Sequence, residues 1–259
     1  MIQKVFNRYE KKYMLTEQEY FAIRQRLAEY MEEDEYGLHT IRNIYYDTQD
    51  DELIRTSLEK PKYKEKFRVR CYGEPNADSS YFLEIKKKYN GIVNKRRIVM
   101  KPAEARAYLE QGKKPAEQSQ IFKEVDYVWN HYELMPKVYL AYDRIALFGK
   151  EDPEFRVTFD QNIRSRNSNL VLEDDTNTTK LLEDGYHLME VKISDAMPLW
   201  FVEILSDLEI RNVSFSKYGN VYKNNLKNDY YSYAHLPENL AGRSVSQPDM
   251  DISGLEATA

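Results

Sequence analysis

Cysteine, clustered histidine and long apolar runs are all scarce in this sequence. One cysteine, Cys71, and four well-separated histidines stand among 259 residues. A single thiol excludes an internal disulfide and a cysteine-based zinc site, because both need several thiols. No HExxH spacing, Walker A loop or GxGxxG glycine pattern is present. Zinc chemistry, Ser/His or Cys/His nucleophilic catalysis and the common nucleotide-binding loops therefore lose support.

Membrane-length segments are also missing. The apolar runs are far shorter than the roughly 18 residues that a membrane helix needs, and Met1 to Arg8 lacks the order of a secretory signal. We therefore expect a soluble cytoplasmic protein with no membrane insertion. The net charge of −5 argues against a whole-surface affinity for nucleic acid, so a cationic site must be local.

The distribution of Gly and Pro predicts one continuous domain. The nine Gly and nine Pro are scattered, and no period of 20 to 50 residues repeats. The sequence becomes polar, small and aperiodic near its end. We therefore expect a domain over residues 1–235 and a flexible C-terminal tail over 236–259.

The periodicity predicts an α+β protein. Thr16 and Glu19 form a capping box before a helix with apolar residues at helical spacing, and shorter helices are predicted at 103–111, 117–133 and 198–210, with another starting near Tyr218. The pair Asn90-Gly91 indicates a hairpin. Alternating strands are predicted at about 5–15, 39–48, 63–73, 80–89, 92–101, 136–148, 153–161 and 185–194. These strands suffice to close an antiparallel eight-stranded β-barrel, a tunnel with helices packed outside.

In several predicted strands, cations and apolar residues alternate, so that even-numbered and odd-numbered positions point to opposite faces. We call this alternation parity. In 64–71 the even positions are Lys64, Lys66, Arg68 and Arg70, whereas Phe67, Val69 and Cys71 occupy the other face. An ordinary barrel would turn the apolar face inward. The alternative is a barrel whose outer apolar face is covered by helices and whose charged interior is wet and occupied by a polyanion, since unpaired buried charge is costly. The same split recurs in Glu84, Lys86 and Lys88, in Arg156, Thr158 and Asp160, and in Glu190 and Lys192.

The residue types on this face suit a phosphate chain. Arginine donates two hydrogen bonds to phosphate oxygens from a planar fork, and lysine adds point charge. Carboxylates can hold Mg²⁺ or Mn²⁺, which take oxygen ligands and bridge phosphate oxygens. Further residues that parity places on this charged face, each with a weaker signal, are Arg8, Glu10 and Lys12, Lys95 and Arg97, and Tyr142 with Arg144. The predicted metal ligands are Glu190, Glu10 and Glu84.

A series of short motifs resembles the tunnel fold of the CYTH and triphosphate tunnel metalloenzyme superfamily, and within it the VTC domain of polyphosphate polymerases. The resemblance covers nearly the whole chain to about residue 230, in the family's order. The motifs are Arg8-Tyr9-Glu10-Lys11-Lys12-Tyr13, Ile44-Tyr45-Tyr46-Asp47-Thr48, Lys66-Phe67-Arg68-Val69-Arg70, Leu83-Glu84-Ile85-Lys86-Lys87-Lys88, Tyr142-Asp143-Arg144, Arg156-Val157-Thr158-Phe159-Asp160, Glu190-Val191-Lys192 and Ser216-Lys217-Tyr218.

The resemblance implies a role for each matching residue. Tyr142 would support the bound phosphates and Glu190 would hold the metal, while Lys66, Lys88, Lys95, Arg97 and Lys192 join the substrate-binding set mainly by parity. The phosphate-clamping residues would be Lys12, Arg68, Arg70, Lys86, Arg144, Arg156 and Lys217.

The expected activity is a metal-dependent polyphosphate polymerase that moves the γ-phosphoryl group of ATP to a growing chain. Hydrolytic relatives resemble Glu-x-Glu-x-Lys at the first strand, and Arg8 replaces the first Glu here, which favours the polymerase. The SPX domain and membrane helices of the eukaryotic polymerase are not seen, so a stand-alone, bacterial-type domain is expected. The alternatives are a tripolyphosphate or nucleoside triphosphate hydrolase and a non-catalytic polyphosphate-binding module; nucleic acid is not an expected partner.

Overall fold

The computed structural model describes residues 9–90, 92–116, 118–193 and 196–234. Two compact units are distinguished, Met1–Tyr222 and Lys223–Ala259. The first contains every strand and five complete helices among the described residues, together with the start of the sixth. The predicted tail, 236–259, lies outside the described residues.

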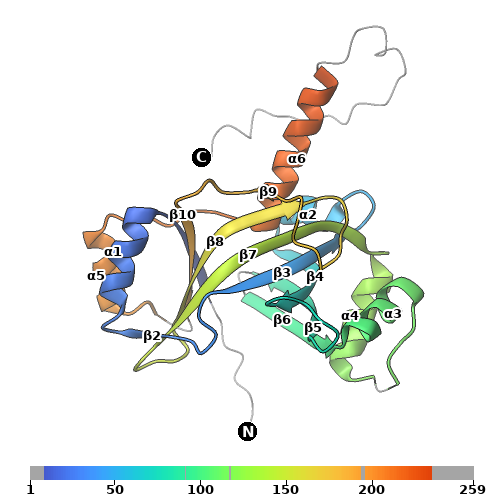
Figure 1. Ribbon diagram of the computed structural model, residues 1–259, viewed down its shortest axis with the longest axis horizontal. Coiled ribbons are helices and arrows are strands. Elements are labelled where there is room, and N and C mark those ends of the chain that lie inside the picture. The colour runs from blue at the N-terminus through green and yellow to red at the C-terminus, as the bar shows by residue number, and fades with distance from the viewer. Residues whose placement is uncertain (1–8, 91, 117, 194–195, 235–259) are drawn as a thin grey trace. The chain divides into compact units, whose positions relative to one another are not determined.

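The first unit is built on one antiparallel sheet (Figure 1). Its path runs β1-β10-β8-β7-β3-β4-β5-β6, and β2 and β9 pair with β7 and β8 beside it. The strands are β1 (Tyr9–Thr16), β2 (Met31–Glu33), β3 (His39–Asp47), β4 (Tyr63–Tyr72), β5 (Tyr81–Tyr89), β6 (Ile92–Met100), β7 (Met135–Gly149), β8 (Arg156–Arg166), β9 (Thr179–Lys180) and β10 (Tyr186–Ile193).

Six helices complete the described chain. The capping box at Thr16 is present, with the Glu19 amide donating to Thr16 Oγ1 and the Thr16 amide to Glu19 Oε2. The predicted hairpin is also confirmed, because Tyr89 of β5 pairs with Ile92 of β6 across a two-residue loop. The helices are α1 (Glu17–Leu27), α2 (Glu52–Leu58), α3 (Pro102–Gln111), α4 (Gln120–His131), α5 (Leu199–Asp207) and α6 (Lys217–Ala234).

Four helices cover the apolar face of the sheet, as the sequence predicts. Phe67, Val69, Leu83 and Ile85 pack in one core cluster with residues of α3 and α4. Val157, Met189 and Val191 pack in a second cluster with residues of α1 and α5. The two pairs of helices lie at opposite ends of the sheet in Figure 1. The charged alternate residues therefore point to the other face.

A third cluster occupies part of that other face and was not expected. It joins apolar residues of the middle strands to α2 and the start of α6. Ile41, Leu140 and Leu188 lie in the same cluster as Ile54 of α2 and Tyr218 of α6. The interior is thus divided between an apolar region beneath these two helices and a charged region beside it.

The prediction of a closed barrel was wrong. The predicted strands and their antiparallel pairing are confirmed, but in the described chain the path ends at β1 and β6, which do not pair with one another. Four consecutive β6 residues, Asn94, Lys95, Arg96 and Arg97, are all exposed. Charged residues on an edge strand disfavour the addition of a further strand, which explains why the sheet stays open.

Candidate functional site

One face of the sheet gathers most of the predicted site residues. Cα pairing places Lys66 beside Lys86 and Lys95, and Lys12 beside Glu190 and Thr158, in rows across neighbouring strands. We call this surface the cationic face. Among the described residues its cations are Lys12, Lys64, Lys66, Arg68, Arg70, Lys86, Lys88, Lys95, Arg97, Arg144, Arg156, Lys192 and Lys217, and its carboxylates are Glu10, Asp47, Glu84, Asp160 and Glu190, so positive charge is in clear excess.

The cationic face is concave. β1 and β5 are six strand steps apart in the sheet order, which would be about 29 Å in a flat sheet with a strand spacing of about 4.8 Å. Nevertheless, Lys86 Nζ of β5 lies 3.3 Å from Glu10 Oε2 of β1. The sheet must therefore curl around this face, and residues from its two ends meet across it.

Two buried carboxylates organise the centre of the cationic face. Arg144 donates from Nε and Nη2 to the two oxygens of Asp160, at 2.5 and 2.7 Å. Lys217, the first residue of α6, lies 2.5 Å from Asp160 and 2.9 Å from Glu190. Burial favours the neutral carboxyl, but Lys217, Lys12 and Arg144 together hold the pKa of Glu190 well below its usual value. The group is therefore an ionised network with fixed geometry.

Lys12 extends this network to the edge strand. Its Nζ lies 3.1 Å from Glu190 Oε1 and 3.4 Å from Glu10 Oε1. Burial would lower the pKa of Lys12, yet Glu190 and Glu10 raise it above its ordinary value. Burial would raise the pKa of Glu10, but Lys86 and Lys12 lower it to about 2. Lys12 therefore joins two ionised carboxylates, one from each of two adjacent strands.

A second ionic group lies on β4, β5 and β6. Arg68 donates from Nε to Glu84 at 2.8 Å and from Nη1 to the Tyr45 hydroxyl at 3.0 Å. Lys95 lies 2.5 Å from the other Glu84 oxygen. Burial would raise the pKa of Glu84, but the nearby Arg68, Arg70 and Lys95 lower it to about 2. Arg68 keeps 18% of its side chain exposed, so it can still reach a ligand.

Arg70 and Tyr142 are joined directly. Arg70 Nη2 donates to the Tyr142 hydroxyl at 3.0 Å, and Arg70 Nε donates to Asn43 Oδ1 at 2.9 Å. The Tyr142 ring also lies under two further cations, Arg144 at 5.1 Å and Lys217 Nζ at 4.7 Å from its centroid. Tyr142 thus connects the two ionic groups through cation–π contacts.

Lys66 and Lys192 carry charge that the protein compensates only in part. Burial, together with the neighbouring cations Lys86 and Lys12, lowers the pKa of Lys66 to about 8, and its Nζ contacts the Ser216 hydroxyl at 3.2 Å. Burial and Arg144 lower the pKa of Lys192 to about 8, although Glu190 and Glu10 act in the opposite direction. A bound anion would favour the charged form of both amines. A bound anion would therefore supply negative charge that these two positions lack in part.

The donor set fits a small divalent cation at two of the three predicted ligands. Glu10 and Glu190 both approach Lys12, and Thr158 beside Glu190 has a buried hydroxyl with no hydrogen-bond partner among the described residues. Mg²⁺ is commonly held by one or two carboxylates together with substrate phosphates. All three carboxylates are paired with cations, but Glu10 and Glu190 share Lys12, whereas Glu84 is held separately by Arg68 and Lys95. The described chain contains no group of three or more metal-ligating side chains.

Three predicted residues lie at the periphery. Arg156 is exposed and donates to the Pro153 carbonyl at 3.3 Å, away from the central carboxylates. Lys88 is exposed opposite Lys64 near the hairpin, and Arg97 stacks over Phe82 at 5.1 Å. Arg8 lies outside the described residues. The centre of the cationic face is therefore formed by the other predicted cations.

Sequence reasoning gave no role in the site to four residues that shape it. The alternation with Arg156 placed Asp160 and Thr158 on the correct face, but it did not predict that Asp160 holds Arg144 and Lys217. Tyr45 and Ser216 come from β3 and the residue before α6, and no alternation marks their contacts with Arg68 and Lys66. Such contacts depend on how the sheet and α6 pack together.

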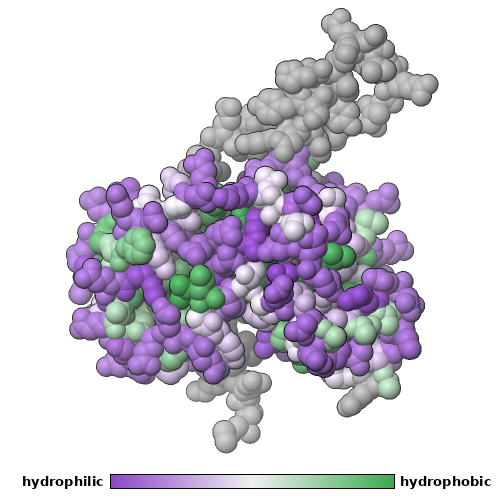
Figure 2. All heavy atoms as spheres, viewed as in Figure 1, coloured by the Kyte–Doolittle hydropathy of each residue, from purple (hydrophilic) through white to green (hydrophobic). Residues whose placement is uncertain are grey.

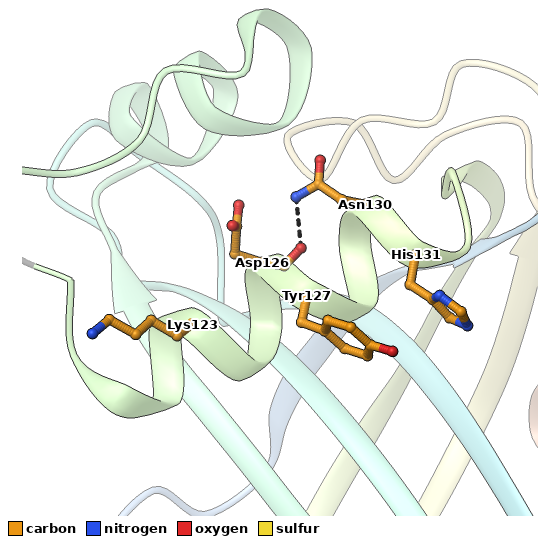
Figure 3. Close-up of a pocket in the computed structure, with 5 residues that line it drawn as sticks. All are labelled: Lys123, Asp126, Tyr127, Asn130 and His131. Carbon is orange, nitrogen blue, oxygen red and sulfur yellow. Dashed lines mark hydrogen bonds between the residues drawn. The ribbon is translucent and has the colours of Figure 1, made fainter.

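A surface pocket elsewhere has none of these features. Figure 3 shows it on α4, lined by Lys123, Asp126, Tyr127, Asn130 and His131. The Asn130 side chain donates to the Asp126 carbonyl of the same helix at 2.7 Å. One lysine beside one aspartate gives no local excess of charge. The pocket is a feature of the helix surface, and the cationic face remains the candidate site.

Comparison with known proteins agrees with this fold. The VTC domain family model matches residues 7–225. A candidate adenylyl cyclase from Hippeastrum, described as having a dominant triphosphatase activity, superposes with a TM-score of 0.52 at 13% identity, over 83% of this chain and 95% of that one. A candidate adenylate cyclase from Bacillus halodurans has a TM-score of 0.49 at 16% identity, over 81% of this chain and 95% of that one. No curated protein matches the sequence. No described helix is both long and apolar enough to cross a membrane.

Proposed function

The chain belongs to the VTC domain family, and we propose that it is a metal-dependent polyphosphate polymerase. In this proposal the γ-phosphoryl group of ATP is transferred to the end of an inorganic polyphosphate chain held on the cationic face. The observation that carries it is the excess of positive charge on one concave surface, where Lys66 and Lys192 are only partly compensated. A polyphosphate chain carries the repeated negative charge that such a surface lacks.

The chemistry requires little covalent work from the protein. A terminal oxygen of the polyphosphate chain attacks the γ-phosphorus of ATP, the bond between that phosphorus and the β,γ-bridging oxygen breaks, and ADP leaves with the electron pair. Positioning and charge neutralisation supply most of the catalysis in phosphoryl transfer. No protein nucleophile is needed, which agrees with the absence of a Ser/His or Cys/His arrangement in the sequence.

The central residues have distinct roles in this proposal. Arg68 and Arg70 donate from forks held by Glu84 and Asn43, and each has further donors for phosphate oxygens. Lys66, Lys192 and Lys86 neutralise the chain as it lies along the face. Asp160 orients Arg144 and Lys217 without itself touching substrate. Lys12 lies between Glu10 and Glu190.

Glu10 and Glu190 are the residues that would hold Mg²⁺ or Mn²⁺, which would supply charge neutralisation and bridging of phosphate oxygens. Their carboxylates are kept ionised by Lys86, Lys12 and Lys217, as the lowered pKa values show. Ionised carboxylates are the form that binds hard cations. The site is therefore prepared for a metal near neutral pH.

Hydrolysis of a triphosphate is the second candidate, since the Hippeastrum protein of similar fold is described as a triphosphatase. The same cations would bind the triphosphate, and water would replace the polyphosphate end as the acceptor. The replacement of the first carboxylate by Arg8 in the first-strand motif favours the polymerase.

The products separate these functions. Purified protein is incubated with ATP and Mn²⁺ or Mg²⁺, chain length is resolved on a gel, and ADP and free phosphate are measured. The polymerase predicts long chains with matching ADP. Free phosphate without chains would identify a hydrolase, and tight polyphosphate binding with neither product would identify a non-catalytic binding module.

The first substitution to test is Arg68→Ala, with Arg96→Ala as its matched control. Arg68 lies on the cationic face, whereas Arg96 is on the opposite face of β6 and pairs with Glu124. We expect Arg68→Ala to reduce chain synthesis at least about 100-fold, a size typical of removing one preorganised donor, while Arg96→Ala retains it. Unimpaired synthesis by Arg68→Ala would count against the assignment of this face.

A further inference from the structure

A row of aromatic rings borders one end of the cationic face. Tyr36, in the turn before β3, lies 6.0 Å from His39, and His39 lies 6.2 Å from Tyr72 at the end of β4. Tyr72 in turn lies 5.3 Å from Phe82 at the start of β5. All these distances join ring centroids. Four rings from three separate segments thus form a continuous row.

The row is continuous with the cations of the face. Arg70 donates from Nη1 to the Tyr72 hydroxyl at 3.3 Å, and its guanidinium lies 5.6 Å from the Tyr72 centroid. Arg97 covers Phe82 at 5.1 Å. His39 is the Cα partner of Arg144. A ligand that contacts these rings can therefore keep a charged portion on the cationic face.

Part of the row is open to solvent. Tyr36 is 69% exposed and Tyr72 is 39% exposed. The opposite end of the same strands is different, because its positions on the cationic face are Lys64, Lys88 and Val93. The two ends of β4 and β5 therefore offer different chemistry, aromatic at one end and cationic at the other.

The ligand that matches both features is flat and aromatic at one end and polyanionic at the other. Bases stack on aromatic side chains of any kind, because each base presents a π-face. Tyr72 lies four positions after Arg68, and at about 3.3 Å per position this is about 13 Å along β4. This is comparable with the length of an extended nucleoside triphosphate.

We propose that Tyr36, His39, Tyr72 and Phe82 form a nucleobase subsite, which binds the base of a nucleoside triphosphate whose phosphates lie on the cationic face. The subsite rests on the proposed function for its ligand class and extends it to the recognition of the donor. Stacking without hydrogen-bond readout predicts that purine nucleotides bind with similar affinity and that inorganic tripolyphosphate does not use the subsite.

The test compares binding of ATP and inorganic tripolyphosphate by titration calorimetry in wild type, Tyr72→Leu and Tyr72→Phe. Tyr72→Phe keeps the ring and removes the hydroxyl that Arg70 contacts, so it separates stacking from an effect on Arg70. The control is Tyr89→Leu, because Tyr89 is 58% exposed at the far end of β5 on the opposite face of the sheet.

We expect Tyr72→Leu to weaken ATP binding about tenfold, within the range for loss of one base–aromatic stack, and to leave tripolyphosphate binding unchanged. Tyr72→Phe and Tyr89→Leu should bind both ligands like wild type. The proposal is overturned if Tyr72→Leu loses affinity for both ligands equally, if ATP binding is unchanged, or if Tyr72→Phe weakens ATP as much as Tyr72→Leu does.

The proposed function fails in a different way. The subsite would stand and the polymerase would be contradicted if the wild-type protein binds ATP through these rings but builds no polyphosphate. The polymerase would stand and the subsite would be contradicted if the protein builds polyphosphate but Tyr72→Leu changes the affinities for ATP and tripolyphosphate equally.

Discussion

Lys66 is the residue at which the conflict between folding and ligand binding is most direct. Its pKa is lowered from 10.5 to about 8 because burial and the nearby Lys86 and Lys12 outweigh the effect of Tyr45. In the free protein the charged amine is therefore unfavourable. The same charge is what a phosphate chain would bind, so the residue contributes to a site at the expense of stability.

The lowered pKa predicts how polyphosphate binding depends on pH. Between pH 8 and 10.5 the unfolded chain holds the Lys66 proton and the free folded protein does not, so stability of the free protein rises with pH. Bound polyphosphate favours the charged amine, so binding takes up protons in this range and weakens as pH rises above about 8. Lys192, with a pKa of about 8, acts in the same direction.

The pH effect is measured as the dissociation constant for polyphosphate from pH 7 to pH 9.5, in wild type and Lys66→Arg. Arginine stays charged throughout, so its curve should be flatter, with Lys192 and Tyr45 accounting for the remaining slope, because cations lower the pKa of Tyr45 to about 8 as well. The exposed Lys62→Arg is the control. Identical curves for Lys66→Arg and wild type would contradict the account.

Asp160 is the residue whose loss should damage the fold most. It is fully buried and holds both Arg144 and Lys217. Breaking a buried ion pair by removing one partner costs about 3–5 kcal/mol, and we expect Asp160→Asn to lose stability of this order in urea unfolding. Asp184→Asn, which removes an exposed partner of Lys180, should change little. Equal midpoints for these two variants would be inconsistent with a structural ionic network.

At the scale of elements, parity was the most informative signal in the sequence. Alternation in β4, β5, β8 and β10 places each cation on the correct face because the side-chain period of a strand is fixed. Contacts between distant elements were not predictable in this way. Ser216 reaches Lys66, and Asp160 reaches Lys217, because the start of α6 packs against the sheet, and this contact leaves no periodic trace in the sequence.

The short helix α2 and the start of α6 are joined by Asp47, at the end of β3. Asp47 accepts hydrogen bonds from the amides of Leu53 and Ile54 in α2 and from the Tyr218 hydroxyl of α6 at 3.0 Å. Sequence reasoning included Asp47 in a motif without predicting α2. The carboxylate therefore fixes the start of α6, and with it the position of Lys217, relative to the sheet.

Tyr218→Phe tests this connection, because it removes the hydroxyl and keeps the ring that stacks on Tyr45 at 4.8 Å. We expect a loss of about 1 kcal/mol in the free energy of unfolding, the typical net value of one hydrogen bond, measured by urea denaturation. The exposed Tyr127→Phe is the control. No loss in Tyr218→Phe would show that the hydroxyl does not hold α6 in place.

At the scale of the first unit, curvature and charge act together. The sheet curls until β1 and β5 side chains touch, and in doing so it concentrates like charges on its concave side. The part of the surface shown in Figure 2 is mostly hydrophilic with separate hydrophobic patches, without one dominant apolar surface. Closure of the barrel was expected from the number of strands, which does not determine whether two charged edges will pair.

Bound polyphosphate should stabilise this arrangement as a whole. A ligand at 100 times its dissociation constant adds about 2.7 kcal/mol to the free energy of unfolding, which corresponds to about 5–10 °C in a domain of this size. We expect such a shift in a thermal unfolding scan, and we expect it to shrink with added salt because charge screening weakens the attraction. A shift that is independent of salt would argue for binding elsewhere than on the cationic face.

The most direct test of the central claim is a polyphosphate titration of Lys66→Met beside Lys62→Met, with urea unfolding of both. Lys66 has no carboxylate among its described contacts, so its loss leaves no acid unpaired. The account predicts that Lys66→Met unfolds at a higher urea concentration than wild type and binds polyphosphate several-fold more weakly, while Lys62→Met changes neither. Wild-type affinity in Lys66→Met would contradict the claim that the cationic face holds the polyphosphate chain.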